Sequence, residues 1–344
     1  MNPDNSPFMK AVRREPADFT PVWLMRQAGR YQPEYRALRE KVGFLELCKT
    51  PSLCAELMLR TVEQLGVDAA IIFSDLLLIL EPMGARLAYD EGAGPVIGNP
   101  IREAADVDRL AELENLDTLA YVMETVRLTR EGLDRRLPLL GFAGAPFTLA
   151  SYLIEGGASR DHRRTKAFMM ADPGAWDVLL SRLARAAARY LNAQLDAGAQ
   201  AVQLFDSWAG CLGPDDYRRF ALPYTQAVIR AVRRPAPVIH FAPGNPALLP
   251  RVAEAGGDVI GVDWRIGLND AWAAIGEDRA IQGNLDPAAL LTNPAEIRRR
   301  VRAVLDQAAG RPGHVFNLGH GVLPQTPVEN AIALVEAVHD LSRR

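Results

Sequence analysis

Cysteine, lysine and histidine are scarce in this chain of 344 residues. It has three cysteines and five histidines, and only four of its 39 basic residues are lysines, so that 39 − 4 = 35 are arginines. Cysteines that are odd in number and widely scattered are typical of a reducing compartment and not of a disulfide framework. With so few lysines, and none at the end of a predicted strand, a lysine Schiff-base enzyme is not indicated.

Long hydrophobic runs are also missing. The longest apolar stretch, Ala69 to Leu80, is interrupted by Ser74 and Asp75, whereas a membrane-spanning helix needs about 20 apolar residues. The first residues contain no apolar segment of the kind found in secretory signals. We therefore expect a cytoplasmic protein that does not interact with a membrane.

Several functional motifs are absent as well. The chain has no Cys-x-x-Cys or His-x-x-x-His pair for zinc and no Gly-x-Ser-x-Gly nucleophile turn. The glycines of residues 92–98 lack the spacing of a phosphate-binding loop. A net charge of −3 argues against a nucleic-acid binder, which needs a basic excess. We expect no metal site and no nucleic-acid partner.

What is present is an alternation of short apolar runs and longer helical segments in a chain that is 49% apolar. The runs are nearly continuous in apolar character, which predicts strands buried on both faces. A closed parallel (β/α)8 barrel, a TIM barrel of the α/β class, fits eight such strands; a doubly wound open sheet is the alternative. We expect a single barrel domain over residues 11–344, after a flexible tail at residues 1–10. The predicted strands are Val22–Met25, Ala69–Phe73, Leu139–Phe142, Ala201–Phe205, Val238–Phe241, Val259–Val262, Ala280–Gln282 and His314–Asn317.

Helix boundaries are marked by capping residues and proline. Thr50-Pro51, Asp172-Pro173 and Asn293-Pro294 each combine an N-cap side chain with proline at the first helical position. Gly66 follows the first of these helices and Gly198 the second, as C-cap glycines do. Residues 84–99 predict a short hairpin or a loop insertion between two elements.

The polar residues that follow the strands are the candidates for function, because a parallel barrel carries its active site at the carboxyl ends of its strands. Two arginines, Arg26 and Arg30, follow the first strand with Gly29 between them, and they predict a clamp for anionic groups. The other positions of this kind are Gln27 and Tyr31, Ser74 and Asp75, Tyr152, Asp206 and Ser207, His240, Asp263 and Arg265, Asn284, and His320.

Asp75 is the most informative of these residues. A carboxylate inside an apolar run is costly unless it is paired or functional; the structural alternative is a helix N-cap, which Ser74 could equally supply. Asp206 and Ser207 carry the same ambiguity, because one of them could cap while the other faces a ligand. His240 and His320 are, taken singly, most simply structural, and His162 is expected to face solvent.

Together, arginines, one buried aspartate, tyrosine, serine and histidine favour a ligand with several carboxylates around a core that carries N–H or cationic groups.

Five blocks of this sequence, in this order, resemble the uroporphyrinogen decarboxylase family over essentially the whole chain. They are PVWLMRQAGRYQPEYR at residues 21–36, FSDLL at 73–77, GFAGAPFTLASYLIEGG at 141–157, QLFDSWAG at 203–210 and FNLGHGVLPQTPVEN at 316–330.

The resemblance implies a single distorted (β/α)8 barrel. It also implies an enzyme that removes CO2 from the four acetate side chains of uroporphyrinogen, leaving the four methyl groups of coproporphyrinogen, without metal or organic cofactor. Homodimers with facing active sites are typical of the family. The substrate-binding residues implied by the motifs are Arg26, Gln27, Ala28, Gly29, Arg30, Arg39, Asp75, Tyr152, Ser207 and His320.

The chemistry explains this set of residues. Loss of CO2 leaves a carbanion, and a pyrrole can accept the electrons itself once a ring carbon is protonated and its nitrogen becomes cationic. A carboxylate beside that N–H stabilises the charge, and we assign this role to an ionised Asp75. The proton donor stays open among Arg26, Arg30, Tyr152 and His320.

Two other functions remain open at this point. A corrinoid-dependent methyltransferase of the same barrel superfamily would hold zinc with a His-x-Cys pair and a later cysteine, but His240 is followed by Phe241 and Ala242. A tetrapyrrole carrier without catalysis would keep the arginines and have no need of Asp75 in an apolar pocket.

Overall fold

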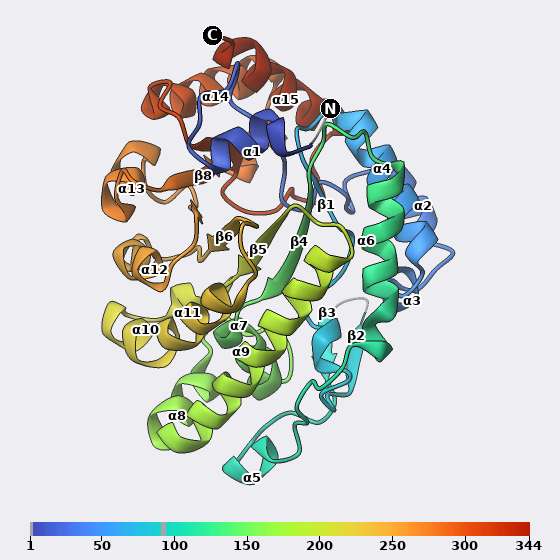
Figure 1. The fold of residues 1–344 in the computed structure, drawn as a ribbon, viewed down its shortest axis with the longest axis vertical. Coiled ribbons are helices and arrows are strands. Elements are labelled where there is room, and N and C mark those ends of the chain that lie inside the picture. Colours follow the sequence, from blue (N-terminus) through green and yellow to red (C-terminus); the bar gives the residue numbers. More distant parts are fainter. Residues whose placement is uncertain (1–2, 91–93) are drawn as a thin grey trace.

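The computed structural model describes residues 3–90 and 94–344, and its parallel strands form a curled sheet surrounded by helices (Figure 1). Within these ranges seven strands pair in the order in which they occur along the chain, whereas a doubly wound sheet reverses its order at a switch point. The open-sheet alternative is therefore wrong. The strands are β1 (Ala70–Ile71), β4 (Leu139–Gly144), β5 (Ala201–Phe205), β6 (Val238–Phe241), β7 (Val259–Gly261), β8 (Ala280–Leu285) and β9 (His314–Leu318).

The first predicted strand, Val22–Met25, is not a regular strand. Val22 forms one isolated parallel bridge with Phe316 of β9, and the Phe316 amide donates to the Pro21 carbonyl over 2.8 Å. On its other side the Asp68 amide, just before β1, donates to the Val22 carbonyl over 2.8 Å. The segment thus lies between β9 and the start of β1 and occupies the eighth position of the barrel, with too few ladder bonds to count as a strand.

Buried side chains tie this irregular segment to the barrel interior. The Trp23 indole N–H donates to Gln282 Oε1 over 2.9 Å, and the Gln282 amide donates to Gln203 Oε1 over 3.0 Å. All three side chains are buried. Because an unpartnered buried polar group costs about 1–3 kcal/mol, this chain of bonds fixes residue 23 relative to β5 and β8 even though the backbone pairing there is sparse.

Helices begin and end where proline and capping residues predicted, but Thr50 forms no capping hydrogen bond: its hydroxyl donates to the Glu46 carbonyl over 2.7 Å instead. In α9 (Pro173–Asp196) the Asp172 carboxylate accepts from the Ala175 amide, and in α14 (Pro294–Ala308) Asn293 accepts from the Glu296 amide. Gly66 closes α4 (Pro51–Leu65) in the left-handed conformation. The remaining helices are α1 (Pro7–Val12), α2 (Pro33–Arg39), α3 (Phe44–Cys48), α5 (Ala104–Val107), α6 (Ala120–Gly132), α7 (Pro146–Glu155), α8 (Arg163–Ala171), α10 (Pro214–Phe220), α11 (Leu222–Ala231), α12 (Leu249–Ala255), α13 (Leu268–Ile275) and α15 (Val328–Ser342).

The N-terminal residues differ from the flexible tail predicted for residues 1–10. From residue 3 onward they are ordered: Ser6 caps α1 by accepting from the Met9 amide over 3.2 Å, and Phe8 and Met9 are buried. Helix α1 packs against β8 and β9. A helix of six residues has little stability of its own, so packing on the barrel holds it, and residue-by-residue propensity could not reveal this. Residues 1 and 2 lie outside the described ranges.

The predicted hairpin is present as β2 (Leu87–Asp90) and β3 (Gly94–Ile97), which pair antiparallel; residues 91–93 of the predicted segment lie outside the described ranges. A bridge between Val96 and Gly157 joins the hairpin to the loop after α7. Figure 1 shows the hairpin at the end of the barrel opposite the two chain termini. This is the end at which β1 terminates, so the hairpin lies at the mouth of the barrel.

Candidate active site

The segment after the first barrel position presents two arginines to the barrel mouth. Arg26 and Arg30 are exposed, and Arg26 has a left-handed backbone with φ of 61°. Gln27, in contrast, is buried: its side chain accepts from the Leu24 amide and donates to the Ala69 carbonyl, and its own carbonyl accepts from the Tyr31 hydroxyl. Gln27 therefore holds the turn together and offers no free group to a ligand.

Asp75 lies four residues beyond the end of β1 and is largely buried. Its Oδ1 atom accepts from the Leu77 amide over 2.8 Å, so the residue does cap the turn that follows. Burial raises the pKa of the Asp75 carboxyl above its ordinary value, whereas the Tyr89 hydroxyl, the Leu77 amide and the charge of Arg26 lower it. Among the described residues Asp75 forms no ion pair within 4.0 Å. A carboxylate that is desolvated and held by one oxygen is suited to receive a cationic or N–H ligand.

Arg26 lies within electrostatic range of three other predicted site residues. Its charge acts on the carboxyl of Asp75, on the phenol of Tyr152 and on the imidazole of His320. Burial raises the pKa of Tyr152 to about 12, and burial together with Arg26 and Arg265 lowers the pKa of His320 below its ordinary value. The structure thus brings one carboxylate, one guanidinium, one neutral phenol and one neutral imidazole together.

Arg30 and Arg39 lie on the side of the mouth formed by α2. Both act on the phenol of Tyr35, whose pKa burial raises and the two arginines lower. Arg39 donates to the Val42 carbonyl, and its guanidinium lies 5.6 Å from the ring centre of Phe44. These two arginines are not among the charges that shift Asp75 most. They extend the positive edge away from the carboxylate and could bind the peripheral carboxylates of a large ligand.

The ambiguity between Asp206 and Ser207 is resolved by burial. Asp206 is fully buried, and its Oδ1 accepts from the Thr148 hydroxyl over 2.9 Å. Thr148 in turn accepts from the Trp208 amide over 3.3 Å, so Asp206 fixes the turn after β5. Ser207 is only half-buried. Asp206 is thus structural, and Ser207 is the residue of the pair left for a ligand.

We expect Asp206→Asn to remove a pH dependence of stability. Burial raises the pKa of Asp206 to about 7, against about 3.9 in unfolded chains. The folded state therefore binds the proton more tightly, and the stability that this group contributes is complete below about pH 4 and lost as the pH rises through about 7. Between pH 5.5 and 8 the free energy of unfolding of the native protein should fall by about 2 kcal/mol relative to the variant, measured by urea denaturation. Asp215→Asn, at an exposed position of α10, is the matched control and should behave as the native protein; parallel curves for native protein and Asp206→Asn would contradict the expectation.

Aromatic residues that sequence reasoning did not single out line the same region. Inward-facing rings of Phe142, Phe205 and Phe241 meet edge to face with centroid separations of 5.7 and 6.1 Å. Trp208 stacks on Tyr152 with ring centroids 3.8 Å apart. They were missed because aromatic residues in buried strands predict core packing as well as a binding wall. The apolar wall lowers the local dielectric, so charges beside it interact more strongly than in water.

Tyr89 is a further residue that was missed. It lies in β2, its ring centroid is 4.5 Å from that of Phe44, and its hydroxyl is buried. The proximity of Asp75 contributes to a raised pKa of the Tyr89 phenol. Only the alternation within β2 hinted at an inward position, and nothing in the sequence indicated which strand the hairpin would lie against.

The structure places two histidines: His162, which the sequence predicted to face solvent, and His240, which was a candidate site residue. His162, expected to face solvent, is only 5% exposed and lies against Trp208 with centroids 4.7 Å apart. His240 is fully buried, and it faces away from the barrel interior: a Cβ on Gly257, after α12, would lie 3.1 Å from its Cβ. Burial lowers the pKa of His240 to about 4. His240 is therefore a neutral structural residue.

Groups of three or more histidine, cysteine, aspartate or glutamate residues close enough to hold a metal ion are not found in residues 3–90 and 94–344. None of the helices in these ranges has the length and apolar character needed to cross a bilayer. Cys48 and Cys54 are buried free thiols, and Cys211 is partly buried.

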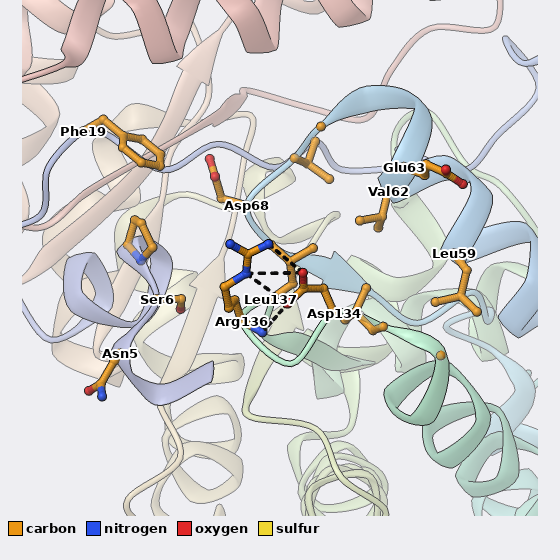
Figure 2. Close-up of a pocket in the computed structure, with 15 residues that line it drawn as sticks. Asn5, Ser6, Phe19, Leu59, Val62, Glu63, Asp68, Asp134, Arg136 and Leu137 are labelled. Carbon is orange, nitrogen blue, oxygen red and sulfur yellow. Dashed lines mark hydrogen bonds and ion pairs between the residues drawn. The ribbon is translucent and has the colours of Figure 1, made fainter. Parts of the chain in front are cut away.

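A cavity of about 810 Å³ lies at the other end of the barrel (Figure 2). It is lined by residues that precede β1 and β4, such as Asp68 and Leu137, together with Phe19 and Ser6. The Asp68 carboxylate is already bonded to the Val22 amide and to His339, over 2.7 and 2.8 Å. In a parallel barrel this end serves stability, and the cavity is separate from the site around Asp75.

Comparison with known proteins gives a consistent result. A family model described as "Uroporphyrinogen decarboxylase (URO-D)" matches residues 3–341. Proteins named uroporphyrinogen decarboxylase from Roseiflexus sp. (strain RS-1) and Sorangium cellulosum are 54% and 53% identical, each over 98% of this chain and over 99% and 96% of their own lengths.

Among solved structures, a methyltransferase from Methanosarcina mazei has a TM-score of 0.77 at 25% identity and covers 97% of both chains. A putative vitamin-B12-independent methionine synthase from Listeria monocytogenes has a TM-score of 0.60 at 12% identity, over 95% of this chain and 98% of that one. At that identity the second likeness shows the barrel fold alone.

Proposed function

The chain belongs to the uroporphyrinogen decarboxylase family, and from this premise we propose which of its residues bind the substrate and carry out the decarboxylation. The reaction converts the four acetate side chains of uroporphyrinogen III to methyl groups and releases CO2 and coproporphyrinogen III, a step of heme biosynthesis. One observation carries the assignment of residues: the largely buried carboxylate of Asp75 lies within electrostatic range of Arg26 and Tyr152, and the charge of Arg26 also acts on His320.

Substrate binding rests on charge complementarity. Uroporphyrinogen carries eight carboxylates around a ring of four pyrrole N–H groups, so that its edge is anionic and its centre donates hydrogen bonds. Arg26 and Arg30 are exposed at the mouth and bind edge carboxylates, with Arg39 further along the same side. The main chain at Ala28 and the Ser207 hydroxyl complete the contacts, and Gly29, whose amide and carbonyl both hydrogen-bond to Gln32, lets the chain turn between the two arginines. Asp75 receives the N–H groups at the centre.

The reaction then proceeds at one pyrrole at a time. A proton adds to a ring carbon, and the ring nitrogen becomes cationic. The bond between the acetate methylene and its carboxylate breaks, CO2 leaves, and the bonding electron pair neutralises the ring. A second proton converts the exocyclic methylene to a methyl group, and loss of the first proton restores the pyrrole, so that one proton is consumed for each CO2 released.

Asp75 stabilises the cationic ring in this scheme and stays ionised throughout. The Leu77 amide and the charge of Arg26 favour its ionised form against the cost of burial. Fixed charges beside an apolar wall need no reorganisation during the reaction, which is why such groups contribute strongly to catalysis. Tyr152 is held against Trp208 and, with His320, lies close enough to Arg26 to contact the reacting ring.

The pH dependence of the rate distinguishes two roles of His320, binding the substrate and donating the proton. Because burial, Arg26 and Arg265 lower its pKa, His320 is neutral at pH 7 and binds as a hydrogen-bond partner. We expect His320→Asn to lower kcat/KM by about tenfold, the effect of one hydrogen bond, with an unchanged shape of the pH–rate profile between pH 6.5 and 8. Loss of a limb of the profile in this range would instead identify His320 as the proton donor.

The assigned activity is tested by incubating the purified protein with uroporphyrinogen III in the absence of oxygen. After oxidation of the products, mass spectrometry counts the carboxyl groups. We expect a progression from eight carboxyl groups to four. Binding without any loss of carboxyl groups would instead indicate a tetrapyrrole carrier.

We also propose that the reaction needs no cofactor, that the protein works as a homodimer, and that it is cytoplasmic. The pyrrole supplies its own electron sink, and the free thiols of Cys48 and Cys54 fit a reducing compartment. Dialysis against a chelator should leave the activity unchanged, whereas a zinc-dependent methyltransferase would be inactivated. Analytical ultracentrifugation at assay concentrations should show twice the mass of 37.7 kDa.

A further inference from the structure

The loop after β9 anchors the main chain at Arg26. The Val322 amide donates to the Met25 carbonyl over 2.9 Å, and the Met25 amide donates to Asn317 Oδ1 over 3.1 Å. Arg26 itself has φ of 61°, a conformation that non-glycine residues adopt only when their surroundings impose it. The direction in which the Arg26 side chain leaves the backbone is therefore set by its contacts with residues 317–322.

Within this loop, Gly321 lies directly under the Arg26 side chain. A Cβ atom on Gly321 would overlap Cδ of Arg26 and would lie 2.8 Å from its Cγ and 3.1 Å from its Nε. Separations below 3.0 Å are not tolerated, so one of the two groups would have to move. The Arg26 side chain can be in its observed place only because residue 321 has no side chain.

Two comparisons show that this glycine is not required by the fold. The φ of Gly321 lies outside the left-handed region, so alanine can adopt the same backbone. A Cβ on Gly319, two residues earlier, would instead meet main-chain atoms, the Trp264 amide nitrogen at 2.7 Å and Asp263 Cα at 2.9 Å. Main chain cannot move aside without disturbing the barrel, whereas an exposed arginine side chain can rotate away.

We propose that Gly321 is a positioning residue of this enzyme: its missing side chain lets Arg26 lie across the loop with its guanidinium close to Asp75, Tyr152 and His320. The proposal rests on the substrate-binding role given above to Arg26. Gly321 itself contacts no reacting group and acts only through the arginine. His320 and Arg26 lie near each other because the loop of residues 317–322 contains His320 and fixes the conformation of Arg26.

The test is a double-mutant cycle on the full chain with Gly321→Ala and Arg26→Ala. We expect Gly321→Ala to lower kcat/KM for uroporphyrinogen about tenfold, at the low end for loss of a hydrogen bond to a charged group, with the loss divided between KM and kcat as it is in Arg26→Ala, and with an unchanged melting temperature. In the Arg26→Ala background the same substitution should change neither parameter. Gly213→Ala is the matched control, because a Cβ there has no heavy atom within 4 Å, and it should behave as the native protein.

The outcomes are distinguishable. Native kinetics in Gly321→Ala, or an equal loss in both backgrounds, would overturn the role of Gly321. A melting temperature lowered by several degrees would mean that the glycine serves the fold. A readout independent of turnover is the quenching of tryptophan fluorescence by uroporphyrin, the oxidised octacarboxylate, whose affinity should fall in Gly321→Ala. If the native protein bound this probe and did not decarboxylate uroporphyrinogen, the proposed function would fail while the positioning of Arg26 would still be tested.

Discussion

Asp75→Asn is expected to lower kcat by about 10²- to 10³-fold, the usual cost of removing one preorganised electrostatic partner of a transition state. The amide keeps the shape of the side chain, and its oxygen can still accept from the Leu77 amide. It has no negative charge to stabilise the cationic pyrrole. KM should change much less, because the arginines still bind the carboxylates. The measurement is the rate of CO2 release under saturating uroporphyrinogen.

Stability provides the control for this variant. Burial raises the pKa of the Asp75 carboxyl, so in the folded protein the ionised form is disfavoured relative to the unfolded chain. The contribution of this group to stability is thus lost as the pH rises through its folded pKa, and asparagine removes that loss. At pH 8 the variant should melt at the same temperature as the native protein or higher. A near-normal kcat in a folded variant would refute the role of Asp75, whereas Asp75→Glu tests mainly geometry.

Arg26→Ala is the second large effect that we expect. A hydrogen bond to a charged partner contributes about 1.5–3 kcal/mol, so kcat/KM should fall about 10- to 100-fold. Most of the loss should appear in KM if Arg26 binds a peripheral carboxylate equally in the ground and transition states, and in kcat if it contacts the acetate that reacts. Steady-state kinetics at two salt concentrations measure both parameters.

Arg60→Ala is the matched control for loss of a positive charge, because Arg60 lies on the exposed face of α4 in a surface pair with Glu56. Surface pairs of this kind contribute little, so this variant should keep native kinetics and stability. Equal losses in Arg26→Ala and Arg60→Ala would show that overall charge, and not the position of Arg26, affects binding.

The strands and helix starts could be predicted because their signals are local. Seven of the eight predicted strands are strands in the structure, since a run such as Leu139–Phe142, which has no polar side chain, is accommodated between two neighbours in the sheet. Asp172 and Asn293 cap helices because their side chains reach an amide three residues away, whatever the rest of the fold does. The eighth position and α1 were not predictable in the same way, because tertiary packing holds them.

The site was predictable only in part. An aspartate in an apolar run is unusual at the level of sequence alone, and Asp75 is in fact largely buried and lies near Arg26. Gln27 and Asp206 occur in the same motifs as the ligand-facing residues, yet they bond to the protein itself. The position of a residue in the sequence does not determine which way its side chain points. Neighbours in one motif can therefore face a ligand or bond to the protein itself.

The sequence alone determined the barrel class, the order of its strands and the charged groups that gather at their carboxyl ends, because these follow from apolar periodicity, local capping and the topology of parallel sheets. Only the tertiary structure decided that the chain closes through an irregular segment at residue 22, that Tyr89 of an inserted hairpin lies near Asp75, and that Gly321 makes room for Arg26. These contacts join residues that are far apart in the chain, and their geometry depends on the packing of every element between them.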